Sequence, residues 1–236
     1  AELAETDAVT LLWDATDLDA TALTAHLERV AVTLDGLLPG LRAPPQHPAL
    51  VVLRDRVAYR HYAVRLALGF DADLGFPGSD GFTLQGVGQG YWDPAQGSLR
   101  PSYTHEYVHA WLAGSAGLPS GRGDWFHEGL AALVQLRFHP QPNLPDFVCQ
   151  GLTDERYRLP LAELLGGHRL PTNRYWQAAT LVEHLLEQHP DAVPGLIEAL
   201  THEGGAAVWL DPVLGMDVET LERAWHEDTQ GRYCGS

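Results

Sequence analysis

Lysine is absent from this chain of 236 residues, so all fifteen of its basic side chains are arginine. Aspartate and glutamate together number 31, which gives a formal net charge of −16 at pH 7 with histidine neutral. Nucleic acids and anionic membranes are bound through basic surfaces, so we expect neither as a partner. Long hydrophobic runs are missing too. No stretch of 18 apolar residues occurs, and the sequence therefore predicts no membrane-spanning helix.

Cysteine is scarce, and Cys149 and Cys234 are the only two. Their spacing is not that of a metal site. If they pair, the disulfide closes a loop of about 85 residues, worth roughly 4–5 kcal/mol in the chain-entropy model. Two separate buried thiols are the alternative, and the sequence leaves both open. No signal peptide is evident, and a start at Ala1 fits either a cleaved mature form or a shortened chain. We expect an extracytoplasmic or secreted protein, with a cytoplasmic one as the alternative.

The composition is that of an ordinary globular protein, with 45% hydrophobic residues and dispersed charge. Apolar periodicity predicts strands and helices in the first half of the chain and helices in the second. The predicted strands cover residues 9–13 and 49–53, and the predicted helices cover residues 22–38, 59–68, 161–165, 175–188, 194–201 and 218–228. The proline-rich residues 140–145 predict a loop. This order indicates an α+β fold in a single domain, residues 1–236, with a mixed N-terminal lobe at 1–120 and a helical lobe at 121–236.

Residues 69–102 are rich in glycine and turn formers, and Gly86, Gly88 and Gly90 stand at every second position within them. In a strand these three glycines share one face and leave its backbone bare of side chains. A loose turn is one alternative. A phosphate loop is another, although the spacing is not G-x-G-x-x-G. We interpret residues 86–90 as an edge strand that pairs with a peptide substrate through main-chain hydrogen bonds. Residues 93–97 then form the hairpin turn back.

The sequence HEYVH at residues 105–109 gives the strongest indication of chemistry. In a helix, His105 and His109 project from the same face onto one metal ion. Glu106 between them is placed to handle the proton of a metal-bound water. With 12 histidines in the chain, about 0.04 chance matches to H-E-x-x-H are expected. The motif therefore needs a second observation beside it.

The sequence WFHEGLA at residues 125–131 supplies that observation. Eighteen residues separate His109 from Glu128, and glycines and a proline interrupt the chain between the two helical runs. Asp124 is the expected N-cap of the second helix, which places Glu128 one turn inside it. A zinc site of two histidines and one glutamate needs its third ligand on such a second helix.

The two segments together resemble the gluzincin metallopeptidases, the thermolysin and aminopeptidase N group. The resemblance is strongest to the bacterial peptidase MA-like proteins, whose second motif reads W-x-x-E-G-x-A. It covers residues 86–189 and, more weakly, residues 216–225. It implies a zincin-like fold in which an edge strand precedes the H-E-x-x-H helix. The metal then lies between the two lobes.

The resemblance also implies one Zn²⁺ per chain, held by His105, His109 and Glu128 with water in the fourth position. Bound zinc lowers the pKa of that water to about 7. Glu106 would accept its proton and pass it to the leaving amine. His127 is the rival third ligand, because neighbouring helical side chains differ by about 100° and only one can face the metal. The resemblance favours Glu128 and leaves His127 exposed or at the rim.

Acyl-transfer chemistry also needs a donor to the developing oxyanion. Gluzincins supply a tyrosine or histidine for it from the helical lobe. Tyr175 opens the segment YWQAA, which is similar to the Y-x-Q-A segment of the peptidase MA-like proteins. Tyr175 is therefore the candidate donor. The alternative is an aromatic residue packed in the core at a helix start.

The chain departs from the family pattern at two places. Thermolysin-type enzymes carry an aspartate one turn after the ligand glutamate, where this chain has Ala132. Support for the ligands must therefore come from elsewhere. The aminopeptidase marker G-x-M-E-N is also missing, and the single methionine, Met216, lies far downstream of its place. This second departure disfavours an aminopeptidase.

The sequence predicts a zinc-dependent metallopeptidase that hydrolyses bonds within peptide chains. The alternative is a non-catalytic binding or assembly protein on a zinc-bound peptidase scaffold. Hydrolysis of a non-peptide amide or ester is a third hypothesis that the sequence leaves open. Glu106 favours catalysis, because a purely structural zinc site closes its fourth position and needs no general base.

Overall fold

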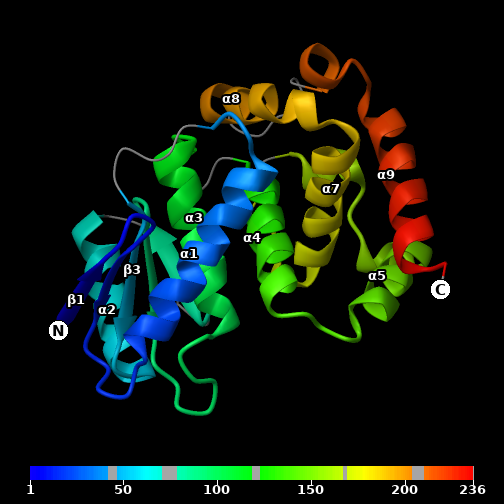
Figure 1. Ribbon diagram of the computed structural model, residues 1–236. Helices are drawn as coiled ribbons and strands as arrows, with labels where there is room; N and C mark the ends of the chain where they lie inside the picture. Colours follow the sequence, from blue (N-terminus) through cyan, green and yellow to red (C-terminus); the bar gives the residue numbers. More distant parts are fainter. Residues whose placement is uncertain (42–46, 71–78, 119–122, 167–168, 204–209, 236) are drawn as a thin grey trace. The chain divides into compact units, whose positions relative to one another are not determined.

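The computed structural model (Figure 1) spans residues 1–236 and describes all of them except residues 42–46, 71–78, 119–122, 167–168, 204–209 and 236. The chain divides into two compact units. Unit 1 comprises Ala1–Gly36 and Arg42–Ser115, and unit 2 comprises Leu37–Leu41 and Ala116–Ser236.

Unit 1 is built around a five-stranded sheet. In chain order its elements are β1 Glu2–Glu5, β2 Thr10–Trp13, α1 Ala20–Leu37, β3 Ala49–Leu53, α2 Arg56–Phe70, β4 Gly81–Leu84, β5 Val87–Tyr91 and α3 Pro101–Ser115. The strand order is β1-β2-β3-β5-β4. The central strands β2, β3 and β5 are parallel, and β1 and β4 pair antiparallel at the two edges.

Strand β3 is apolar throughout and buried along its three middle residues, because helices cover both faces of the sheet there. Leu11 in β2 and Leu50 in β3 are fully buried. Helix α2 lies on one face, where the ring of Tyr59 is 5.7 Å from Phe82 and 5.4 Å from Tyr91. Side chains alternate along a strand, so the neighbours of Phe82 and Tyr91 face the other way, towards α3.

Strand β5 holds two of the three alternating glycines, but it is an interior strand of the described sheet, so the prediction of an edge strand there is wrong. The adjoining edge is β4. Gln85 and Gly86 connect β4 to β5 with φ of 50° and 76°, the pair of positive values that a tight type I′ hairpin turn requires. Residues 93–97 do form a turn, but it joins β5 to α3 and is not the predicted hairpin.

Unit 2 is helical in the residues that the structure describes. Its helices are α4 Asp124–Phe138, α5 Leu144–Thr153, α6 Leu161–Leu164, α7 Tyr175–Gln188, α8 Val193–Glu203 and α9 Val218–Tyr233. Helices α4 and α7 make the most extensive contact between described helices of this unit. The core between them is apolar and includes Leu130, Val134, Ala178, Leu181 and Val182, all fully buried.

A glycine permits the close approach of α4 and α7. A Cβ at Gly129 would lie 2.6 Å from the carbonyl oxygen of Ala178 and 2.8 Å from a methyl group of Val182. Only a residue without a side chain fits that contact at this separation. The glycine beside Glu128 therefore fixes how closely α4 packs on α7.

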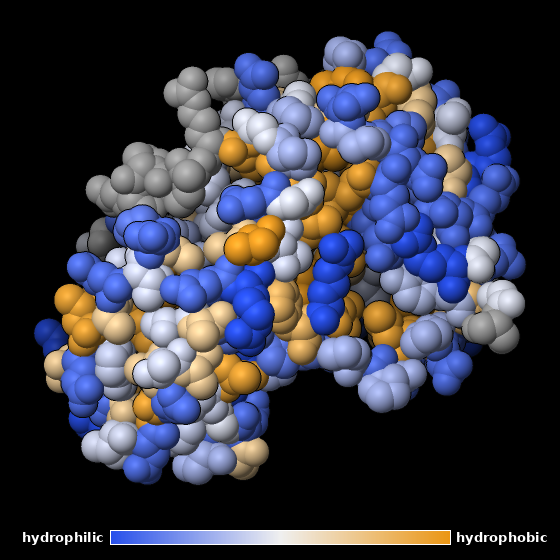
Figure 2. All heavy atoms as spheres, viewed as in Figure 1, coloured by the Kyte–Doolittle hydropathy of each residue, from blue (hydrophilic) through white to orange (hydrophobic). Residues whose placement is uncertain are grey.

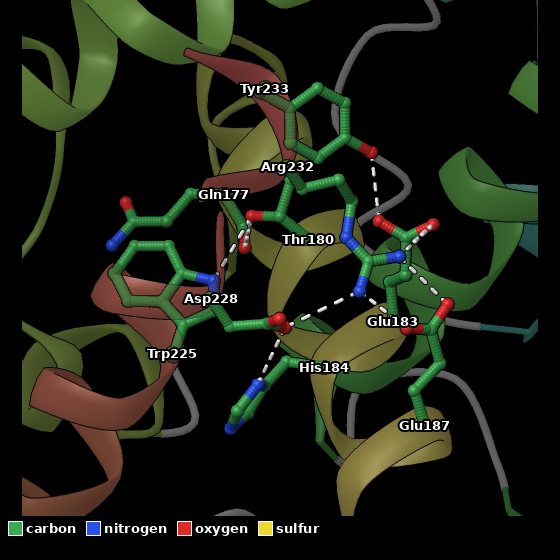
Figure 3. A network of polar contacts seen from close by, with 9 residues as sticks. All are labelled: Gln177, Thr180, Glu183, His184, Glu187, Trp225, Asp228, Arg232 and Tyr233. Atoms are coloured by element: carbon green, nitrogen blue, oxygen red, sulfur yellow. Dashed lines mark hydrogen bonds and ion pairs between the residues drawn. The ribbon is translucent and has the colours of Figure 1, made fainter. Parts of the chain in front are cut away.

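Helix α9 is tied to its neighbours by a disulfide and by charges. Cys149 in α5 is bonded to Cys234 after α9, which settles the pairing that the sequence left open. Figure 3 shows the network between α7 and α9, in which Arg232 donates to Glu187 at 2.8 Å and Tyr233 donates to Glu183 at 2.8 Å. The hydrogen bonds from Arg232 hold the pKa of Glu187 below its ordinary value.

The surface over α9 is hydrophilic (Figure 2). Its exposed residues are Glu219, Arg223, Glu227, Gln230, Gly231 and Arg232. The opposite side of the helix buries Leu221 and Trp225, and the Trp225 indole donates to the Thr180 hydroxyl of α7 at 3.2 Å. Among the described residues, no helix has the length and apolar character needed to cross a bilayer.

The mixed α/β first half and the helical second half confirm the coarse fold prediction. The strand at 49–53 and the helix at 175–188 have the predicted bounds, and the predicted helices at 22–38, 59–68, 161–165, 194–201 and 218–228 lie within three residues of the observed starts. Strands β1 and β4 and helix α5 were not predicted. Helix α5 begins inside the proline-rich segment because Pro145 occupies its first turn, where proline needs no backbone N–H.

Candidate metal centre

Helix α3 carries the HEYVH sequence on unit 1. It starts at Pro101, whose fixed φ suits a first helical position. Its side chains His105 and His109 stand one turn apart, with ring centroids 4.8 Å from each other and ring planes at 80°. His109 is buried and His105 half-buried. The two histidines therefore stand one turn apart on α3 with their rings close together, and their part as metal ligands stays a prediction.

Glu106 lies on the side of α3 that packs on the sheet. Its side chain is 6% exposed. The hydroxyl of Thr83 in β4 donates to its carboxylate Oε2 at 2.8 Å and also lies 3.1 Å from its main-chain oxygen. A Cβ at Gly81 would meet the Glu106 Cγ at 2.6 Å, and one at Gly88 would meet its main-chain oxygen at 3.0 Å. The glycines of β4 and β5 therefore make room for Glu106 to pack against the sheet.

The third residue of the predicted set, Glu128, is in α4. His105, His109 and Glu128 each offer a ligand atom, and these atoms all lie within 4.8 Å of one another. Across the described part of the chain, this is the one such group of three or more histidine, cysteine, aspartate or glutamate side chains. Two imidazoles and one carboxylate are the donor set of catalytic zinc sites, which keep a fourth position for water or substrate.

His127, the rival ligand, is not a member of this group. It is 2% exposed, so the prediction that it lies exposed or at the rim is wrong. The physical reason is that α4 is buried along most of its length, including Trp125 and Phe126 before it. A one-residue offset on such a helix turns a side chain into the core instead of into solvent.

The start of α4 also differs from the prediction by one residue. Gly123 is the N-cap, with φ of 61°, and Asp124 is the first residue of the helix. A Cβ at Gly123 would lie 3.0 Å from a methyl group of Leu200 in α8. The left-handed backbone and the close contact both favour glycine there. Asp124 still places a negative charge in the first turn, where the helix dipole favours it.

A buried arginine holds the turn that leads into α3. Arg100 has no exposed side-chain surface, donates to the Tyr91 carbonyl at 2.7 Å and pairs with Asp80 at 3.0 Å. Tyr103 in α3 donates to the same carbonyl at 2.8 Å. Burial raises the pKa of the Tyr103 hydroxyl, which keeps it protonated as that donor. These contacts join the end of β5 to the first turn of α3.

Tyr175 and the three alternating glycines are the remaining residues that were predicted for the site. Tyr175 is the first residue of α7 and half-buried, and its part as an oxyanion donor stays a prediction. Gly86 lies in the hairpin turn. The bare faces of Gly88 and Gly90 are covered by α3, since a Cβ at Gly90 would lie 2.9 Å from the Tyr103 ring. Covered faces cannot receive a peptide, which removes the physical argument for these glycines as substrate contacts.

Sequence reasoning missed Thr83. It lies in β4, a strand that the sequence did not predict, 23 residues before its partner Glu106. No spacing rule connects the two positions, because only the antiparallel pairing of β4 with β5 brings Thr83 opposite Gly88 and over α3. Its role is visible only in three dimensions.

No protein-family model matches the sequence, and no curated protein matches it. Among solved structures, the chain is similar to an M1 zinc metallopeptidase from Deinococcus radiodurans, a mutant bound to a Tyr-Ser-Ala substrate. The two chains are 14% identical with a TM-score of 0.50, and the match covers 96% of this chain and 50% of that one. This chain thus spans about half the length of its solved neighbour. At this identity the likeness concerns the fold, which it relates to that of a zinc metallopeptidase.

Proposed function

We propose that this protein is a zinc-dependent hydrolase of the gluzincin type that cleaves peptide bonds, most simply within peptide chains. The observation that carries the proposal is the group of His105, His109 and Glu128, whose ligand atoms lie within 4.8 Å of one another. The fold similarity to a zinc metallopeptidase supports it. We take the whole chain as one catalytic domain with one zinc ion.

Each residue of the site has a distinct part in this proposal. His105 and His109 bind the ion through neutral imidazole nitrogens, and Glu128 binds it through a carboxylate oxygen. Zinc, when bound, supplies Lewis acidity that activates a water molecule and polarises the scissile carbonyl. Glu106 takes the proton of the attacking water and delivers it to the leaving amine nitrogen. Tyr175 is the proposed donor to the oxyanion that develops during attack.

The substrate would pair with β4 instead of β5. β4 is an edge of the described sheet, so one side of its backbone lacks a strand partner there. Its residue Thr83 contacts Glu106, which places this edge beside the proposed general base. An extended peptide that adds to a sheet edge gains main-chain hydrogen bonds without a demand on its side chains. The alternating glycines then serve the packing of α3.

The disulfide supports an extracytoplasmic location for this activity. Cys149 and Cys234 are bonded, and stable disulfides persist mainly in oxidising compartments such as the periplasm and the cell exterior. A peptide substrate agrees with that location.

Zinc content tests the proposal directly. Purified protein is expected to hold close to one zinc ion per chain by elemental analysis, and Glu128→Ala should lose most of it because one of three protein ligands is gone. Glu198→Ala is the matched control, since Glu198 is an exposed glutamate on another helix of unit 2. A protein that holds no zinc and takes up none at micromolar concentration would overturn the proposal. Zinc that Glu128→Ala retains in full would overturn the ligand set.

Turnover is the second part of the same test. A library of internally quenched peptides should be cleaved by the zinc-loaded protein, and cleavage should stop when a chelator removes the ion. A zinc-loaded protein that cleaves no peptide in the library would instead favour a binding or assembly protein with a structural metal.

A further inference from the structure

We propose that Thr83 is a positioning residue for Glu106, which holds the carboxylate in the orientation needed for proton transfer. This inference rests on the proposed function, because it assigns a partner to the proposed general base. Its basis is one contact within unit 1. The Thr83 hydroxyl lies 2.8 Å from Oε2 and 3.1 Å from the main-chain oxygen of Glu106.

Both acceptors of this hydroxyl belong to the same residue. A threonine hydroxyl carries one hydrogen, so that hydrogen is shared between the side-chain and main-chain oxygens of Glu106. The shared contact fixes the carboxylate relative to the backbone of α3. It also makes the two carboxylate oxygens inequivalent, since Oε2 is the one that accepts from Thr83. A glutamate side chain has three rotatable bonds, and a freely turning carboxylate would spend little time in any one orientation.

The strands beside Glu106 carry glycines where a larger residue would collide with its side chain. A Cβ at Gly81 would stand 2.8 Å from Oε1 and 2.6 Å from Cγ, and one at Gly88 would stand 3.1 Å from the Glu106 Cβ. In the register of the hairpin, Thr83 is directly opposite Gly88. The two glycines therefore bring α3 close enough for a short side chain such as threonine to reach the carboxylate.

A general base acts only when its carboxylate lies within hydrogen-bond reach of the proton that it takes, so its orientation matters for proton transfer. Groups that orient reacting side chains typically change activity by about 10- to 100-fold when they are removed. The hydroxyl of Thr83 is supplied by β4, the same edge strand that we propose to receive the substrate. Substrate binding and orientation of the base would thus share one element.

The test compares Thr83→Val with Thr83→Ser. Valine keeps the shape of threonine and removes the hydroxyl, whereas serine keeps the hydroxyl and removes a methyl group. On the internally quenched peptides that wild type cleaves, Thr83→Val is expected to lower kcat about 10- to 100-fold with KM and zinc content nearly unchanged. Thr83→Ser is expected to keep kcat within about threefold of wild type. Thr33→Val, which removes a hydroxyl from the exposed side of α1, is the matched control and should leave kcat unchanged.

The outcomes separate this inference from the proposed function. If wild-type protein is active and Thr83→Val has wild-type kcat, the positioning role is wrong while the proposed function stands. If Thr83→Ser loses as much kcat as Thr83→Val, the hydroxyl is not the reason and the role is again wrong. If Thr83→Val fails to fold, Thr83→Ser still tests the role, because it keeps the hydroxyl. A folded, zinc-loaded Thr83→Ser whose kcat lies far more than threefold below wild type overturns the role. If zinc-loaded wild type cleaves no peptide, the proposed function fails and this role falls with it.

Discussion

Glu106 is the residue on which the proposed chemistry depends most. It is 6% exposed, accepts a hydrogen bond from Thr83 and stands between two histidines that share a helix face. Burial of a carboxylate is costly, because the charged form loses its hydration. Gly81 and Gly88 make room for the side chain, and the hydrogen bond from the Thr83 hydroxyl offsets part of that loss.

Glu106→Gln is expected to keep the zinc ion and lose turnover. The amide is close in size to the carboxylate, so the ligands are undisturbed, but it cannot accept the proton of water. General base catalysis contributes about 10²- to 10⁴-fold, and kcat should fall by that amount. The measurement is kcat on a peptide that wild type cleaves, with zinc content determined on the same sample. Glu198→Gln is the control, and turnover of Glu106→Gln within a factor of two of wild type would contradict the proposed mechanism.

Much of the candidate site at this scale could be predicted from the sequence. The pair His105 and His109 follows from helical spacing, and Glu128 follows from its place early in the next helix. His127 could not be placed in the same way. Its exposure depends on what packs against α4, and a helix buried on most sides gives no clear polar face in the sequence. Thr83 was likewise hidden, because its contact is made across strand pairing.

At the scale of elements, the position of Glu128 depends on the contact between α4 and α7. Gly129 follows Glu128 and touches the backbone of α7, with its missing Cβ only 2.6 Å from the Ala178 oxygen. A backbone atom cannot yield as a flexible side chain can. The approach of these two helices is therefore set by one glycine, and any side chain there must push them apart.

Gly129→Ala is expected to lower the free energy of unfolding by about 1–3 kcal/mol, the usual cost of overpacking a core. Gly231→Ala in α9 is the matched control. A Cβ at Gly231 meets nothing within 4 Å, so alanine should stabilise that helix by about 0.5–1 kcal/mol. Denaturant unfolding of both variants checks the pair. Equal effects of the two substitutions would show that helix propensity and not packing governs position 129.

Elements differ in how far the sequence predicts them. The bounds of α7 follow from its apolar stripe of Leu181, Val182 and Leu185 and from the proline after its end. The strand at β5 was predicted, but its place in the sheet was not. A strand of glycines looks like an edge when only its own sequence is considered. The structure instead pairs it on both sides, and the bare face is filled by α3.

At the scale of the whole molecule, the disulfide is the crosslink that connects residues far apart in the sequence. It joins Cys149 to Cys234 across a sequence separation of 85 residues. All elements from α6 to α9 lie within the loop that it closes. A crosslink of this span removes conformations mainly from the unfolded chain, since the folded ends already lie 5.5 Å apart at their Cα atoms.

Replacement of both cysteines by serine is expected to lower the free energy of unfolding by up to about 4–5 kcal/mol, the chain-entropy value for a loop of this length. Thermal or denaturant unfolding measures the loss. Wild-type protein treated with a reducing agent should lose a similar amount, whereas the double variant should not respond to the reagent. A wild type whose unfolding is unaffected by reduction would contradict the expected contribution of the bond.

The sequence by itself determined the element types in both halves and the spacing of a two-histidine, one-glutamate set, because helical periodicity and loop length are local properties. It left open whether Cys149 pairs with Cys234, and it placed the edge strand and His127 wrongly. Strand order, helix burial and the contact between Thr83 and Glu106 join residues far apart in the chain. Only the packed structure decided them, because each depends on which surfaces are left for a segment to meet once all the others are in place.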